Sequence, residues 1–327
     1  MTRPFAPTAR RLPRWLVGGV SAIAVGIIPL AALMAQGAPA SFTVIETGQG
    51  FASLQQAVDA IGAGEGTIEI APGNWRECAV QTQGTVTFRA AIPGESLLGG
   101  TACEGKASLV LRGAGAKVDG LVFADITVPD GNGAGIRLEN GPLYVSQSWF
   151  RDSQQGILTV NGVDSELVID KSTFTRLGTC ENSSGCAHSI YAGDYGRVVV
   201  TRSRFEQGQG GHYLKSRAGH NTILDNSFDD THGRQTNYMI DLPNGSGGTV
   251  ARNWFVQGEH KENWSALIAV GAENPGYSAD GLTIEANDAR LAPGLNRTPA
   301  FVADWTGDAL VIRDNRLGPN IRPFESR

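Results

Sequence analysis

The chain has 327 residues, of which 41% are hydrophobic and 18% charged, so it can bury a core and is not of a disordered composition. Its 43 glycines favour many turns and short strands over long helices. The formal net charge is −5, and it falls to −9 when the first 40 residues are left out, which argues against a nucleic-acid partner.

Residues 1–40 differ from the rest of the chain. Four arginines and no acid precede an apolar run from Trp15 to Met34, and small residues follow at 38–40. This order is typical of a signal peptide, and the run is also just long enough to span a bilayer. We therefore expect export, to the periplasm or the medium, with residues 1–40 either cleaved or retained as an inner-membrane anchor through residues 15–35. Residues 41–327 are expected to form one domain.

The segment that follows predicts a helix and then a strand. Apolar residues at Phe51, Leu54, Ala57, Val58 and Ile61 share one helical face. Such a helix can cover the open end of a stack of coils and protect its edge. A strand with a Pro-Gly turn is expected next, over residues 66–75.

A repeat runs through the remainder of the chain at spacings of 23 to 34 residues. Its anchors are aromatic or aliphatic, and a valine or isoleucine stands five residues before each one. The anchors are Phe123, Phe150, Phe174, Phe205, Phe228, Phe255, Ala289 and Leu317. One repeat of this length matches one coil of a solenoid in which like residues stack on like.

A small polar residue lies two positions before seven of these anchors. These residues are Ser148, Ser172, Ser203, Asn226, Asn253, Asn287 and Asn315. We expect them to turn the chain, because asparagine tolerates the left-handed backbone region that a tight bend needs. The sequence therefore predicts an all-β right-handed parallel β-helix, a solenoid with an N-terminal capping helix. The frame of a leucine-rich repeat is absent.

Each coil is expected to hold a further strand after its anchor. Aligned on the inward aliphatics Ile136, Ile157, Ile190, Leu214, Ile240 and Ile268, the next residues should point outward together. Those residues are Arg137, Leu158, Tyr191, Lys215, Asp241 and Ala269. Successive residues of a strand point to opposite faces, so this row should form one exposed stripe.

The helix at 51–61 and the Thr-Ile-Glu-Ile-Ala-Pro-Gly segment after it resemble the opening of pectate-lyase-like β-helix proteins. The resemblance covers nearly all of the part beyond residue 40. That superfamily includes lyases, hydrolases, C5-epimerases and non-enzymatic spikes, so the resemblance implies the fold more firmly than an activity.

Lysine, arginine, tyrosine and histidine gather on the expected stripe and suit β-elimination on a uronate polymer. That reaction needs a cation on the carboxylate, a base for the C5 proton and an acid for the leaving oxygen. We predict Lys215 as the base, Arg217 or Tyr191 as the acid, and Arg137 with His212 as carboxylate ligands, and we include His188 in the catalytic set. The predicted substrate-binding set is Arg137, Asn132, Asp130, Tyr238, Asp241, Asn244 and Glu273.

Other functions stay open at this stage. Hydrolysis would need two carboxyls, for which Asp194, Asp241 and Glu273 are candidates. A C5-epimerase shares the first half of the lyase mechanism, and a non-catalytic glycan-binding protein of exopolysaccharide assembly would keep the groove without the chemistry. We expect a monomer with a polysaccharide partner and no metal or other required cofactor. Ca²⁺ is left open at Asp130 and Asn132.

The four cysteines fit an oxidising compartment. Sequence alone allows three pairings. We predict Cys78 with Cys103, which lie about one coil apart, and Cys180 with Cys186 in a short loop beside the expected groove. A zinc site is the rival interpretation, but no two cysteines have the two-to-four-residue spacing of zinc ligands.

Overall fold

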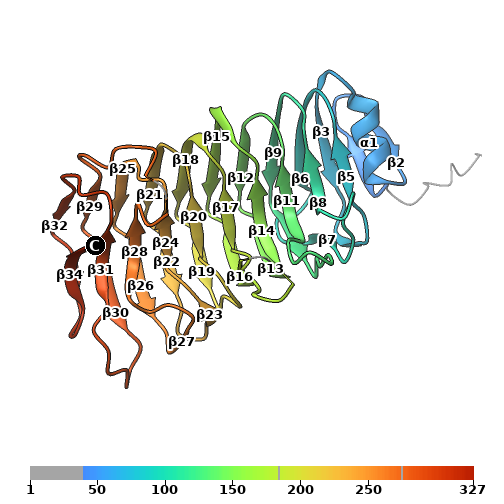
Figure 1. Cartoon of the computed structure of the whole chain (residues 1–327). Coiled ribbons are helices and arrows are strands. Elements are labelled where there is room, and N and C mark those ends of the chain that lie inside the picture. Colours follow the sequence, from blue (N-terminus) through green and yellow to red (C-terminus); the bar gives the residue numbers. More distant parts are fainter. Residues whose placement is uncertain (1–39, 183–184, 274) are drawn as a thin grey trace, which may run out of the picture. The chain divides into compact units, whose positions relative to one another are not determined.

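The computed structural model describes residues 40–182, 185–273 and 275–327, and the expected signal peptide or anchor lies outside this range. Within the described residues the chain winds as a β-solenoid whose coils contribute strands to three long sheets (Figure 1). Pairing along these sheets is parallel except at the N-terminal strands, where β1 pairs antiparallel with β2 and β3. The all-β parallel fold expected from the repeat is confirmed.

Sheet A is the longest of the three. Its strands, in spatial order, are β2 (Gln49–Phe51), β1 (Phe42–Val44), β3 (Glu65–Ile70), β6 (Thr85–Ala90), β9 (Gly115–Asp119), β12 (Leu143–Ser146), β15 (Gly162–Asp170), β18 (Tyr195–Thr201), β21 (His220–Leu224), β25 (Gly247–Ala251), β29 (Thr283–Glu285) and β32 (Val311–Arg313).

Sheet B contains the anchor positions of the repeat. Its strands are β4 (Gly73–Trp75), β7 (Ser96–Gly99), β10 (Leu121–Ala124), β13 (Trp149–Ser153), β16 (Thr173–Leu177), β19 (Arg204–Glu206), β22 (Ser227–Asp229), β26 (Trp254–Gln257), β30 (Asp288–Leu291) and β33 (Arg316–Leu317).

Sheet C contains the strands expected after each anchor. They are β5 (Ala79–Gln81), β8 (Ala107–Leu111), β11 (Ala134–Leu138), β14 (Gln155–Thr159), β17 (Ile190–Ala192), β20 (Leu214–Ser216), β24 (Ile240–Leu242), β28 (Ala266–Val270), β31 (Ala300–Asp304) and β34 (Arg322–Ser326). A small parallel pair, β23 (Arg234–Thr236) with β27 (His260–Lys261), lies apart from the three sheets.

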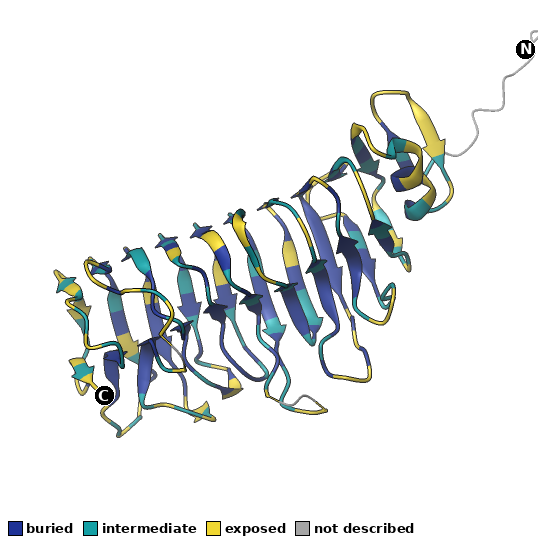
Figure 2. Ribbon diagram, turned by 45° about the horizontal axis from the view of Figure 1, so that its top comes forward, coloured by how far each residue is buried: buried dark blue, intermediate teal, exposed yellow. Residues whose placement is uncertain are grey.

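The core is a column of stacked like residues. The anchors pair with one another in the predicted register all the way from Phe123 to Leu317. Six of them are phenylalanines whose rings stack with centroids 4.7 to 5.0 Å apart and planes within 8° of parallel. This spacing equals the separation of adjacent strands, so each coil adds one ring to the column. Figure 2 shows the buried residues continuing along the stack.

The serine and asparagine positions differ in one respect from the expectation. The left-handed residue is the one before each of them, with φ of 48° to 60° at Gln147, Lys171, Arg202, Asp225, Arg252, Ala286 and Asp314. The small polar side chains instead form a buried ladder from coil to coil. The Asn253 amide donates to the Ile223 carbonyl at 2.9 Å, and its Oδ1 accepts from the Asn226 backbone at 2.9 Å. Their role is to satisfy backbone groups that the bend leaves buried.

The N-terminal helix is present as α1 (Leu54–Ile61), with Ser53 as its N-cap. Leu54, Ala57 and Val58 are buried, and the helix packs beside β1, β3 and β5. Phe51 belongs to β2 rather than to the helix. Both predicted disulfides, Cys78–Cys103 and Cys180–Cys186, are formed. Two disulfides are typical of an oxidising, extracytoplasmic setting.

Candidate functional site

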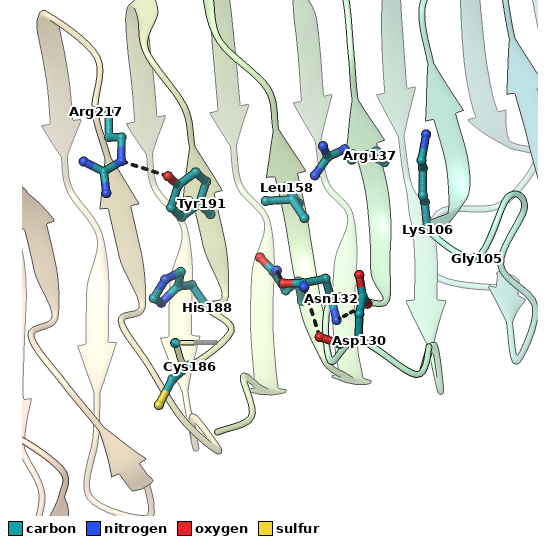
Figure 3. A pocket seen from close by; sticks show the side chains of 12 residues that line it. Gly105, Lys106, Asp130, Asn132, Arg137, Leu158, Cys186, His188, Tyr191 and Arg217 are labelled. Atoms are coloured by element: carbon teal, nitrogen blue, oxygen red, sulfur yellow. Dashed lines mark hydrogen bonds between the residues drawn. The ribbon is translucent and has the colours of Figure 1, made fainter. Parts of the chain in front are cut away.

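A groove of about 630 Å³ lies on the outer face of sheet C. Strands β11, β14 and β17 form its floor, and loop residues at 105–106, 130–132 and 185–186 form its walls (Figure 3). The outward row has the predicted register: Arg137 pairs with Leu158, Leu158 with Tyr191, and Tyr191 with Lys215. It is not the exposed stripe that was expected, because its last three members, Lys215, Asp241 and Ala269, are buried. The groove lining includes six of the predicted site residues, namely Asp130, Asn132, Arg137, His188, Tyr191 and Arg217.

Arg137 is the cation of the groove that the protein leaves least engaged. Its Nε lies 3.4 Å from Oε1 of Glu139 and makes no hydrogen bond within the described part of the chain. Glu139 is already bound by Lys106 at 2.9 Å and by Arg112 at 2.5 Å. The Arg137 side chain is 24% exposed and lines the groove although its Nε is buried, so an incoming carboxylate would meet a cation that is already partly desolvated.

Tyr191 and Arg217 form a hydrogen-bonded pair at the other end of the groove. Arg217 Nε donates to the Tyr191 hydroxyl at 2.8 Å, as the dashed line in Figure 3 shows. Its Nη1 donates to Asn244 at 2.7 Å, which fixes the plane of the guanidinium. The bond fixes the position of the Tyr191 hydroxyl at this end of the groove.

His188 is held in one tautomer. Its Nδ1 accepts the backbone N–H of His212 at 3.0 Å, so in the neutral ring the proton resides on Nε2. Burial, followed by the charges of His212 and Lys215, lowers the pKa of His188 well below its usual 6.5. The ring is therefore neutral near pH 7 and can donate from Nε2. It lies 5.6 Å from the Tyr191 ring, centroid to centroid.

Lys215, Glu273, Asp241 and Arg217 form an ion-pair cluster beside the groove. The Lys215 ammonium, 8% exposed, lies between the carboxylates of Glu273 and of Asp241, the latter at 3.2 Å. The other Glu273 oxygen accepts from Arg217. Although partial burial opposes it, bonding from Lys215 and Arg217 lowers the pKa of Glu273 to about 2. None of Lys215, Asp241 and Glu273 lines the groove.

His212 and Asp241 are buried together below this cluster. His212 Nε2 lies 3.3 Å from Oδ2 of Asp241, and the two side chains are 8% and 3% exposed. Burial, with the charge of Lys215, lowers the pKa of His212 to about 3. Burial also raises the pKa of Asp241 to about 6, against the effect of Lys215. His212 does not line the groove, but its ring lies 5.0 Å from that of His188, which does, and its predicted role as a carboxylate ligand stays a prediction.

The remaining predicted residues divide between the groove and its surroundings. Asp130 and Asn132 lie in the wall, where Gln155 donates to Asn132 at 2.8 Å. Tyr238 is buried against His212, and its hydroxyl accepts from Asn263 at 2.9 Å. Asn244 does not line the groove, and its side-chain oxygen accepts a hydrogen bond from Arg217. Among the described residues no three His, Cys, Asp or Glu side chains gather as metal ligands, and no helix is long and apolar enough to cross a membrane.

Sequence reasoning missed several groove residues. Lys106, Gln155 and the Gly185–Cys186 segment line the groove as well. Gln155 lies on β14, two positions before the inward Ile157, so the repeat places it on the inner side of the strand rather than in the outward row. Lys106 directly precedes β8, one coil before the first residue of the outward row. Extending the row by one coil reaches Val110, which pairs with Arg137, so the repeat does not point to Lys106 in the loop before the strand.

Comparison with known proteins finds one similar solved structure and no related sequence. No protein-family model matches the sequence, and no curated protein matches it. Among solved structures, the chain is similar to ORF18 of Geobacillus virus E2, at 13% sequence identity and a TM-score of 0.44. The alignment covers 84% of this chain and 57% of the viral one, so the chain spans little more than half of that structure's length.

Proposed function

We propose that the protein is an extracytoplasmic enzyme of the pectate-lyase-like kind that cleaves an acidic polysaccharide by β-elimination in the sheet C groove. One observation supports this most: the groove combines Arg137, whose Nε has no hydrogen-bond partner among the described residues and only a 3.4 Å contact with Glu139, with a tyrosine hydroxyl bonded to a second guanidinium. The first suits a uronate carboxylate, and the second suits proton exchange at the adjacent carbon.

The elimination assigns one task to each of these groups. Arg137 binds the carboxylate on C5, and the Nε2–H of neutral His188 donates to the charge that develops on it as the proton leaves. Tyr191 acts as the base in this scheme: its deprotonated oxygen, held in place by Arg217, takes the C5 proton. The electron pair forms the C4=C5 bond, the C4–O bond breaks, and Tyr191 returns the proton to the glycosidic oxygen when both lie on one side of the ring.

Lys215 has a different task in this scheme from the one expected from sequence. A base needs a free electron pair, but the Lys215 ammonium is held by two carboxylates and is almost fully buried. We therefore assign proton transfer to Tyr191. Lys215 then holds Glu273 and Asp241 in place behind it.

Hydrolysis is supported less by the same contacts. It needs one carboxyl that can give a proton and one that is free to act as base or nucleophile. Asp241 is 3% exposed, and both oxygens of Glu273 are bound by cations. C5-epimerisation uses the same residues up to proton removal, and non-catalytic glycan binding needs only Arg137. The reaction products, or their absence, therefore distinguish these two functions from a lyase.

The test is to incubate the full chain with a panel of polyuronates and follow the ultraviolet absorbance of the new C=C bond. We expect one polymer to give signal, and Tyr191→Phe to reduce its rate by on the order of 100-fold or more. Tyr144→Phe is the matched control, because that tyrosine is exposed on sheet A. Absence of signal with every polymer, or full activity in Tyr191→Phe, would contradict the lyase. Deuterium uptake at C5 without cleavage would indicate an epimerase.

A further inference from the structure

The carboxylate of Glu273 fills a cationic site that belongs to an earlier coil, two strands away in sheet C. Its two oxygens bind Lys215 and Arg217, which precede it by 58 and 56 residues. Glu273 itself lies in the loop after β28 (Ala266–Val270). The two cations come from the coil of β20, next to Tyr191.

The cations are fixed, whereas the carboxylate is exposed. Lys215 and Arg217 are 8% and 23% exposed, but the Glu273 side chain is 44% exposed. Without Glu273, Lys215 keeps its contact with Asp241 at 3.2 Å, and Arg217 keeps Tyr191 and Asn244. The site would therefore survive the departure of Glu273 with its geometry intact and with one net positive charge, since Asp241 balances only one of the two cations.

The loop does not depend on the Glu273 side chain for its position. The Glu273 backbone donates to the Pro243 carbonyl at 3.2 Å, and Gly276 donates to that of Asn244 at 2.8 Å. Further along, the Tyr277 hydroxyl donates to Asp194 at 2.5 Å. The carboxylate can thus swing out into solvent by side-chain rotation alone.

We propose that Lys215 and Arg217 form a second carboxylate subsite, which Glu273 occupies in the free protein and which a uronate of the substrate takes over on binding. The inference rests on the proposed function, since it assumes an acidic glycan in the groove. Arg137 and Lys215 are three strands apart in the same row, or about 14 Å, with Tyr191 between them. The two subsites therefore select a polymer in which the reacting sugar and a nearby sugar both carry carboxylates, a polyuronate rather than a chain with isolated uronates.

The subsite can be tested without turnover, by titrating sodium glucuronate into the full-length protein by calorimetry. Arg137→Ala serves as the background, so that binding at the first subsite does not contribute. Adding Glu273→Gln should tighten glucuronate binding by about tenfold, because the internal competitor is removed while the size is kept. Glucose, which lacks the carboxylate, should show no gain.

Glu285→Gln is the matched control, since Glu285 pairs with an arginine on sheet A, at 2.7 Å. An equal gain in this variant would overturn the proposal, because net charge alone would then explain it. No gain in Glu273→Gln would also overturn it. If Glu273→Gln does not fold, Glu273→Asp takes its place, with a smaller gain expected and no gain contradicting the subsite. If the protein cleaves no polymer of the panel but Glu273→Gln still tightens glucuronate binding, the subsite is supported and only the proposed reaction is refuted.

Discussion

Sheet B places a phenylalanine at the same inward position in six consecutive coils, whereas the outward row of sheet C has six different residues on the matching coils. The inward six stack ring on ring at 4.7 to 5.0 Å. The outward six run from Arg137 to Ala269 in an equally regular register. The backbone repeats in both rows, but only the column inside the coils requires the side chain to repeat, because each ring there packs directly on the rings above and below it. The outer face of sheet C has no such column, although Lys215, Asp241 and Ala269 on it are buried, so its residues can differ and function can use that freedom.

The largest expected effect is on the interior row. Phe205 is fully buried between Phe174 and Phe228, with ring centroids at 4.8 and 4.7 Å. Phe205→Ala should lower the free energy of unfolding by about 3–5 kcal/mol, measured by urea denaturation. Phe324→Ala is the control, because Phe324 is 43% exposed on the last strand and should lose about 1 kcal/mol or less. Similar losses in the two variants would break the distinction between interior and exterior positions.

The asparagine ladder should come next. Asn253→Ala removes the donor to the Ile223 carbonyl and the acceptor for the Asn226 backbone, both buried. We expect a loss of about 3 kcal/mol, because each unsatisfied buried group costs about 1–3 kcal/mol. Asn253→Ser should lose less, since Ser172 and Ser203 already perform the acceptor role in earlier coils. A serine variant as unstable as the alanine variant would argue against a ladder based on hydrogen bonds.

The two disulfides should differ in their effect on stability. Cys78 and Cys103 are 25 residues apart, so breaking that bond frees a whole coil and should cost about 3 kcal/mol in the chain-entropy account. Cys180 and Cys186 are only 6 residues apart and should cost less. Cys186 also lines the groove, so its loss should affect binding more than stability. Melting curves of the two double-serine variants decide the order, and a larger drop for the short loop would reverse it.

The smallest expected effect is on the pH dependence of the free energy of unfolding, to which His212 and Asp241 contribute with opposite signs. His212 has a folded-state pKa of about 3, so the unfolded chain binds more protons between pH 3 and 6.5, and stability rises with pH there. Asp241, with a pKa raised to about 6, has the opposite effect between pH 3.8 and 6. Asp241→Asn should therefore make the free energy of unfolding rise more steeply from pH 4 to 6. An unchanged slope in denaturation at several pH values would count against this coupling.

Much of the fold could be predicted from sequence because stacking imposes a repeat. Anchors, second strands, the outward row and both disulfides follow from spacing alone. The left-handed corner could not be placed, because residues as different as Lys171 and Ala286 adopt it and leave no pattern. For the site, the sequence predicted only which strands carry it. Lys215 is paired with Asp241, its neighbour in the predicted row, and also with Glu273, which reaches it from a loop that the repeat does not place.

The different positions of His188 and His212 could not be predicted from the repeat either. They lie one coil apart and look alike in sequence, but one lines the groove and the other is buried below it. Their tautomers and charges follow from single contacts, such as the backbone N–H that His188 accepts. Periodicity locates a strand, whereas these contacts depend on the turns between strands.

The most direct test of the central claim is the affinity of the full-length protein for an oligouronate in two arginine variants, Arg137→Ala and Arg313→Ala. Arg137 lies in the groove, and Arg313 pairs with Glu285 on sheet A. We predict that Arg137→Ala binds at least about tenfold more weakly than wild type, while both variants unfold within about 0.5 kcal/mol of it. Equal affinity in the two variants, or weaker binding that only reflects lost stability, would contradict the assignment of function to the outer face of sheet C.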